Sequence, residues 1–83
     1  MQQAVKMLAF AGARDVIGSG ELDMPLGGPC TAAELLDAVC ARFPGLVPYR
    51  GSLRIAINGV YADASDPVRS GDEVALIPPV AGG

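Results

Sequence analysis

The residues that offer chemistry in this 83-residue sequence are its last six, Pro78-Pro79-Val80-Ala81-Gly82-Gly83. Proline donates no backbone hydrogen bond and glycine is conformationally free, so we expect residues 79–83 to form a flexible arm rather than a strand. Gly82 and Gly83 have no Cβ and would fit a channel too narrow for other residues. The arm presents the α-carboxylate of Gly83, which is an anion at neutral pH and a poor electrophile. Chemistry at this carboxylate therefore requires activation from outside.

The rest of the chain offers no means of activating that carboxylate. It contains neither a G-x-x-x-x-G-K-[ST] phosphate-binding loop nor a G-x-G-x-x-G dinucleotide motif, and it has no histidine to act as a base near neutral pH. The sequence therefore favours a substrate or carrier over an enzyme. A frayed and chemically idle glycine terminus stays open as the alternative.

The amino-acid composition limits which partners the protein can bind and in which compartment it is expected. A net charge of −3 with six scattered basic residues disfavours binding to nucleic acid or to an anionic membrane. No stretch approaches the roughly 20 apolar residues that span a bilayer. Cys30 and Cys40 are too few for a zinc or iron–sulfur site without histidine, so we expect no metal and no bound cofactor. Two packed, reduced thiols indicate a cytoplasmic protein.

Hydrophobic periodicity predicts one small α+β domain. Thr31 and Glu34 form a capping box at the start of a helix that ends at Pro44-Gly45. The apolar stripe of this helix consists of Ala32, Leu35, Leu36, Val39 and Phe43. The expected strands are 5–11, 21–26, 53–57, 60–62 and 73–77, and Pro25 confines the second to a sheet edge. Residues 12–20, 45–51 and 63–69 are expected to be irregular, and Asn58-Gly59 to form a tight turn.

This order of strands around one main helix favours a β-grasp (ubiquitin-like) fold, a mixed sheet of four to five strands with the helix on one face. The first and last strands are then parallel neighbours at the sheet centre. We assign residues 1–78 to this domain and 79–83 to the arm. The other face of the sheet is left open, with Phe10 and Ile77 at the root of the arm. This apolar pair indicates a docking patch, although scattered exposed apolar side chains are also normal.

The end of the chain carries a specific pattern. G-D-E-V-A at 71–75 followed by P-P-V-x-G-G at 78–83, together with Asn58-Gly59, Phe10 and Arg14-Asp15, resembles the small subunits of molybdopterin synthase. The resemblance covers nearly the whole chain and implies a ubiquitin-like sulfur carrier that is not itself an enzyme. In that family a partner enzyme uses ATP to adenylate the terminal glycine, and a sulfur donor converts the adenylate to a thiocarboxylate. The large synthase subunit, expected to hold the catalytic residues, then takes the sulfur for the dithiolene of molybdopterin.

Residue roles follow from the same resemblance. Gly83 carries the sulfur, and Val80, Ala81 and Gly82 form the slim part of the arm. Phe10, Tyr61 and Ile77 match family positions on the apolar surface that meets the large subunit and the activating enzyme, which implies a hetero-oligomer. Ala9 and Ile77 stand where the family often has phenylalanine, which implies a smaller patch. Sulfur carriers for thiamine or cysteine synthesis and ubiquitin-like protein modifiers are the alternatives, since they share this fold and activation chemistry.

Overall fold

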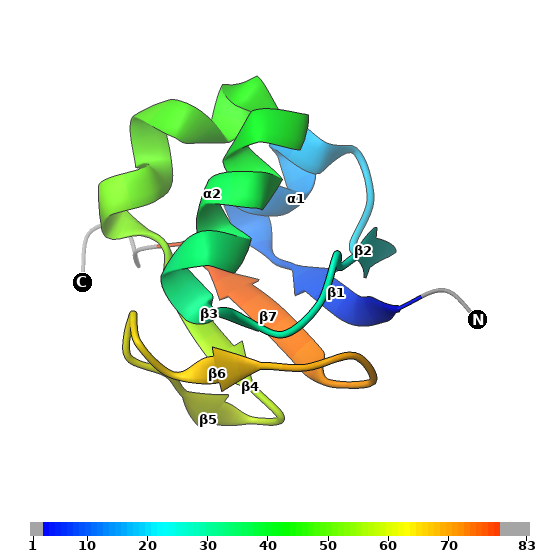
Figure 1. Ribbon diagram of the computed structural model, residues 1–83. Coiled ribbons are helices and arrows are strands. Elements are labelled where there is room, and N and C mark those ends of the chain that lie inside the picture. Colours follow the sequence, from blue (N-terminus) through cyan, green and yellow to red (C-terminus); the bar gives the residue numbers. More distant parts are fainter. Residues whose placement is uncertain (1–2, 79–83) are drawn as a thin grey trace.

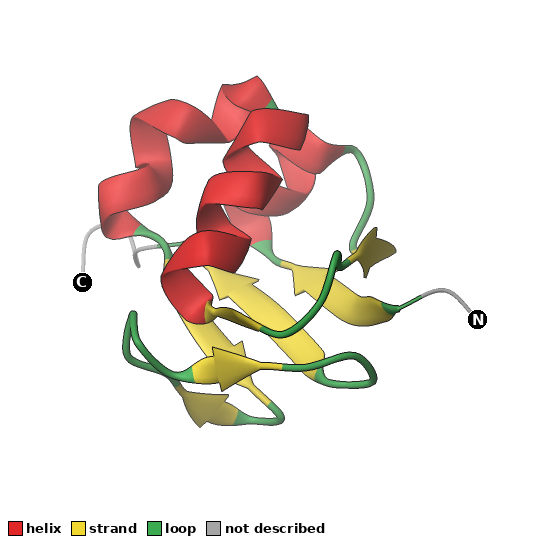
Figure 2. Cartoon of the chain, viewed as in Figure 1, coloured by secondary structure: helices red, strands yellow, loops and turns green. Residues whose placement is uncertain are grey.

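The computed structural model describes residues 3–78, which form a mixed five-stranded sheet with helices against one face (Figure 1 and Figure 2). The strands of this sheet are β1 (Ala4–Ala9), β2 (Glu21–Pro25), β4 (Arg54–Ile57), β5 (Val60–Tyr61) and β7 (Glu73–Ile77). Their order is β2-β1-β7-β4-β5. β1 and β7 are parallel, and the other neighbours are antiparallel. The predicted β-grasp arrangement is confirmed, including the edge position of the strand that contains Pro25.

The hydrophobic core lies between this sheet and the long helix α2 (Ala32–Arg42). Alternation along β1 buries Val5 and Met7 completely and leaves Lys6 exposed between them. Val74 and Leu76 of β7 are also fully buried, because they face the core between the sheet and α2. The inward face of the two central strands therefore agrees with the predicted alternation.

Helix α2 begins at the predicted capping box. Thr31 Oγ1 accepts the Glu34 backbone N–H at 3.1 Å, and Glu34 Oε1 accepts the Thr31 N–H at 2.9 Å. The predicted stripe is buried at Ala32, Leu35, Leu36 and Val39. Phe43 is an exception, because it follows the last helical residue and is only half-buried. This cap stabilises the start of the helix that covers the sheet.

Residues 11–17 form a second helix, α1 (Ala11–Ile17), although the first strand was predicted to continue to Ala11 and residues 12–20 to be irregular. That prediction was wrong because it gave the three glycines of residues 12–20 more weight than the apolar spacing. Ala13, Val16 and Ile17 have the i, i+3, i+4 spacing of a helix face; Ala13 is buried, and the other two pack against the core. Gly18 ends the helix in the left-handed conformation (φ 84°).

Two more segments predicted as irregular are ordered. Residues Pro44–Ser52 form successive 3₁₀ turns, η1, around the buried Leu46. β6 (Pro67–Val68) pairs with β3 (Cys30–Thr31) in a separate two-stranded sheet, and Val68 is fully buried. The prediction missed both because two-residue strands and 3₁₀ turns are too short to show a hydrophobic period.

The turn between β4 and β5 is the predicted Asn58-Gly59 turn. Both residues have positive φ, 51° for Asn58 and 85° for Gly59. Such a pair is what a two-residue type I′ hairpin requires, because its twist matches that of the flanking strands. The turn therefore holds β5 against β4 at the end of the sheet.

Candidate functional site

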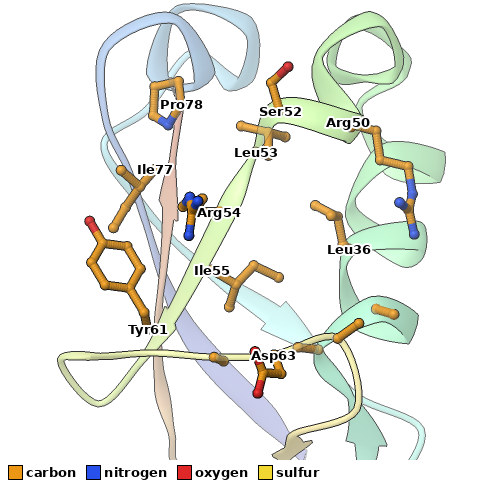
Figure 3. A pocket seen from close by; sticks show the side chains of 15 residues that line it. Leu36, Arg50, Ser52, Leu53, Arg54, Ile55, Tyr61, Asp63, Ile77 and Pro78 are labelled. Carbon is orange, nitrogen blue, oxygen red and sulfur yellow. The ribbon is translucent and has the colours of Figure 1, made fainter. Parts of the chain in front are cut away.

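The last described residues, Ile77 and Pro78, line a groove of about 730 Å³ (Figure 3). Leu36 of α2 and Arg50 of η1 lie on one side of it, and Tyr61 and Ile77 lie on the other. Leu53 and Ile55 lie between these sides. The groove therefore extends to Pro78, the last described residue.

Strand register explains which side chains meet at this groove. Arg54 is opposite Ile77 in the β4–β7 pair, and Ala56 is opposite Tyr61 in the β4–β5 pair. Residues two apart on a strand share a face, so these four side chains lie on the sheet face that α2 does not cover, and three of them, Arg54, Tyr61 and Ile77, line the groove. The Arg54 guanidinium lies 5.9 Å from the centre of the Tyr61 ring, within cation–π range.

Charged side chains also line the groove, namely Arg50, Arg54 and Asp63. Arg50 is already paired with Asp37, whose Oδ1 accepts from Arg50 Nε at 2.7 Å. Within residues 3–78 no carboxylate lies within ion-pair distance of Arg54. The groove therefore combines apolar side chains with the Arg54 guanidinium, and the Asp63 carboxylate also lines it. Sequence reasoning assigned Arg54 no role, although its alternation with Ile55 places it on the open face.

The structure brings together only part of the predicted partner surface. Tyr61 (63% exposed) and Ile77 line the groove, and Phe10 (50% exposed) does not. Phe10 follows β1 and is the N-cap of α1, next in sequence to Ala9, which pairs with Leu76. Phe10 therefore lies at the same end of the sheet as Ile77, as predicted.

The expectation that Ala9 makes the patch smaller is wrong. Ala9 is 2% exposed and belongs to the core on the α2 side of the sheet, so its side chain is not part of the open face. The four arm residues with predicted roles, Val80, Ala81, Gly82 and Gly83, lie outside the described residues.

The two thiols are not activated as nucleophiles. Burial raises the pKa of Cys30, and the nearby Glu34 carboxylate raises it further. Burial also raises the pKa of Cys40, against the opposing effect of the Arg50 charge. A reactive cysteine requires a lowered pKa, so both residues are packing residues here.

No group of three or more His, Cys, Asp or Glu side chains in residues 3–78 is arranged to hold a metal ion. In the same part of the chain, every helix is too short or too polar to cross a membrane.

Comparison with known proteins agrees with this fold. Residues 7–83 match the model of the ThiS family. A molybdopterin synthase sulfur carrier subunit from Aedes aegypti is 43% identical, with 95% of this chain and 88% of the relative covered. The crystal structure of small archaeal modifier protein 1 from Haloferax volcanii superposes with a TM-score of 0.82 at 28% identity, covering 94% of this chain and 99% of that one.

A third comparison is with an assembled protein. One chain of the complex of subunits 1 and 2 of molybdopterin-converting factor from Helicobacter pylori superposes with a TM-score of 0.66 at 26% identity. The match covers 96% of this chain and 99% of that one. The family match spans most of the sequence, and the alignment with the Aedes aegypti relative covers most of both proteins. The chain therefore belongs to the ThiS family.

Proposed function

We propose that this chain is the sulfur carrier subunit of a molybdopterin synthase and carries the sulfur as a thiocarboxylate on Gly83. The observation that carries the proposal is the 43% identity, over 95% of the chain, to a protein named for that role. The P-P-V-x-G-G ending supplies the terminal glycine that the chemistry needs. The described domain supports a carrier role, because its thiols are unactivated and its groove lies at the root of the arm.

The chemistry at Gly83 proceeds in two exchanges. A carboxylate oxygen attacks the α-phosphate of ATP and pyrophosphate leaves, which gives an acyl-adenylate with an electrophilic carbonyl carbon. A sulfur nucleophile then attacks that carbon and AMP leaves, so the terminus ends as a thiocarboxylate. ATP is used by a partner activating enzyme rather than bound by this chain. The residues that catalyse the final transfer lie on the large synthase subunit, and the reactions take place in the cytoplasm.

Docking of the large subunit and of the activating enzyme is assigned to the open face at the root of the arm. Tyr61 and Ile77 supply apolar area, Arg54 supplies a cation, and Phe10 extends the surface at the end of β1. Aromatic residues and arginine are the side chains that most often dominate interface energies. The relative in the Helicobacter pylori complex, which is named for subunits 1 and 2, supports a hetero-oligomer.

The test is to add one alanine after Gly83. The extended protein should unfold at the same urea midpoint as the original, because the addition lies beyond the folded domain. Reconstituted with the activating enzyme, a sulfur source and the large subunit, it should form no thiocarboxylate and no molybdopterin. Synthesis at the original rate would refute the terminal-carboxylate mechanism.

A protein modifier is the second candidate, since the Haloferax volcanii relative is named as one. A tagged copy expressed in its own host would then form covalent conjugates that survive a denaturing gel. A sulfur carrier for thiamine or cysteine synthesis would instead fail to bind the large synthase subunit. Both outcomes are distinct from the thiocarboxylate and stable complex that molybdopterin synthesis requires.

A further inference from the structure

We propose that Asn58 is a site of spontaneous deamidation whose rate is controlled by its hydrogen bonds to Asp72 and Glu73. Asn58 is the one asparagine in the sequence, and glycine follows it. Its side chain closes the β4–β5 turn onto the loop that precedes β7, a contact we call the turn clamp. This inference is independent of the proposed function.

The reaction needs no enzyme and no oxidant. The backbone nitrogen of Gly59 attacks the side-chain carbonyl carbon Cγ of Asn58, the Cγ–Nδ2 bond breaks, and ammonia leaves with a proton from Gly59. Water then opens the resulting cyclic imide at either carbonyl, giving aspartate or isoaspartate. Glycine favours the attack because it has no Cβ to obstruct it. Gly59 is exposed, and a Cβ built on it would meet nothing within 4 Å.

The turn clamp holds both ends of the Asn58 amide. Asn58 Nδ2 donates to Asp72 Oδ1 at 3.1 Å, and Asn58 Oδ1 accepts the Glu73 N–H at 3.0 Å. The Asn58 backbone N–H also donates to the Glu73 carbonyl at 2.8 Å. The amide therefore points toward β7, and both side-chain hydrogen bonds must break before Cγ turns to the Gly59 nitrogen.

Asp72 is itself held in place. The Arg69 N–H donates to Asp72 Oδ2 at 2.9 Å, and this bond, followed by that from Asn58, lowers the pKa of Asp72. The carboxylate is thus ionised and oriented when it accepts from Asn58. Deamidation is restricted to the fraction of molecules in which this turn has opened.

The product would keep the turn open. A carboxylate at position 58 would face the Asp72 carboxylate at a position where the amide donated a hydrogen bond, and two like charges there repel. Isoaspartate would also add one main-chain carbon to a two-residue turn. Deamidation of Asn58 is therefore expected to loosen β5 permanently.

The test compares deamidation rates at pH 8 and at a temperature well below unfolding. Intact-mass analysis detects the increase in protein mass that occurs when the amide becomes an acid. Fragmentation shows whether the added mass is at residue 58. Asp72→Ala removes the acceptor and should deamidate roughly tenfold faster than the original chain. Asp72→Asn keeps one acceptor oxygen and should give an intermediate rate, and it serves as the test if the alanine variant does not fold.

Thr31→Ala is the matched control, because it removes the α2 cap and leaves the turn clamp intact. It should deamidate at the original rate. Equal rates in the original chain and the Asp72 variants would overturn the proposal. So would a Thr31→Ala rate as high as that of Asp72→Ala, because general destabilisation would then explain the effect.

Discussion

Tyr61 combines high exposure with a specific neighbour. The residue is 63% exposed, its ring centre lies 5.9 Å from the Arg54 guanidinium, and it lines the groove that extends to Pro78. Its hydroxyl has no hydrogen bond to other side chains within residues 3–78. Such a residue contributes little to folding and has most of its surface free for a partner.

Tyr61→Ala should therefore weaken binding to the large synthase subunit by at least about tenfold, as expected for a tyrosine at an interface centre. The unfolding midpoint should hardly change, since exposed substitutions usually alter stability by less than about 0.5 kcal/mol. Isothermal titration calorimetry with the purified large subunit measures the affinity. Val47→Ala is the control, because Val47 is 58% exposed on η1 and does not line the groove. Equal losses in the two variants would contradict the assigned surface.

Asp72 makes stability depend on pH. Hydrogen bonds from the Arg69 N–H and the Asn58 side chain hold its pKa below the ordinary carboxyl value. A lowered folded-state pKa means that its stabilisation is complete above the unfolded-state value, roughly 3.9, and disappears as the pH falls through the folded-state value. The contribution is screened because Asp72 is near the surface.

Asp72→Asn should therefore cost about 1 kcal/mol of unfolding free energy at pH 7, and the deficit should shrink as the pH falls below 4. Urea titrations across that range measure it. Asp23→Asn is the comparison, since no side-chain hydrogen bond or ion pair within residues 3–78 involves Asp23. A deficit that stays constant with pH would show that Asp72 acts through packing instead.

The contact between α1 and η1 depends on one glycine. A Cβ built on Gly45 would lie 2.8 Å from Val16 Cγ1, closer than real side chains approach. Val16 packs against the core from α1, so it has little room to withdraw. A side chain at position 45 would therefore force Val16 or the backbone to shift where these two elements meet.

Gly45→Ala should destabilise the protein by about 1–3 kcal/mol, the usual cost of overpacking. Adding Val16→Ala should recover part of that loss, although Val16→Ala alone is itself destabilising. Urea unfolding of both single variants and the double variant gives the coupling energy. Strictly additive effects would mean that the two residues do not collide.

The start of α2 gives a second prediction for an element. Thr31→Ala removes the acceptor for the Glu34 N–H and should cost about 1 kcal/mol. Thr31→Ser keeps a hydroxyl at the cap and should stay close to the original stability. Thermal unfolding of the two variants checks this, and equal losses would show that the methyl group matters rather than the cap.

At the scale of the whole molecule, the sheet could be predicted because its central strands are long enough to show alternation. Val5, Met7, Val74 and Leu76 face one side of the sheet as their positions require. The capping box likewise predicted where α2 begins. These signals are local in sequence, and the parallel β1–β7 pair follows from them together with the rules of strand connection.

The short strands and the groove could not be predicted, because they depend on contacts between residues distant in sequence. β3 and β6 are two residues each, and their pairing joins Cys30 to Val68, so neither segment indicates a strand alone. The groove forms from α2, η1, β4, β5 and the end of β7, and the role of Arg54 appears only when these are assembled. By contrast, the role proposed for the terminal glycines rests on their sequence and on family membership.

The most direct test of that role is intact-mass analysis after incubation with the activating enzyme, ATP and a sulfur source. The account predicts a species heavier by the exchange of one oxygen for one sulfur, which fragmentation places at Gly83. A sample without ATP should show only the original mass. An unchanged mass in the complete reaction, or a sulfur located at Cys30 or Cys40, would contradict the proposal that this chain carries sulfur on its terminal glycine.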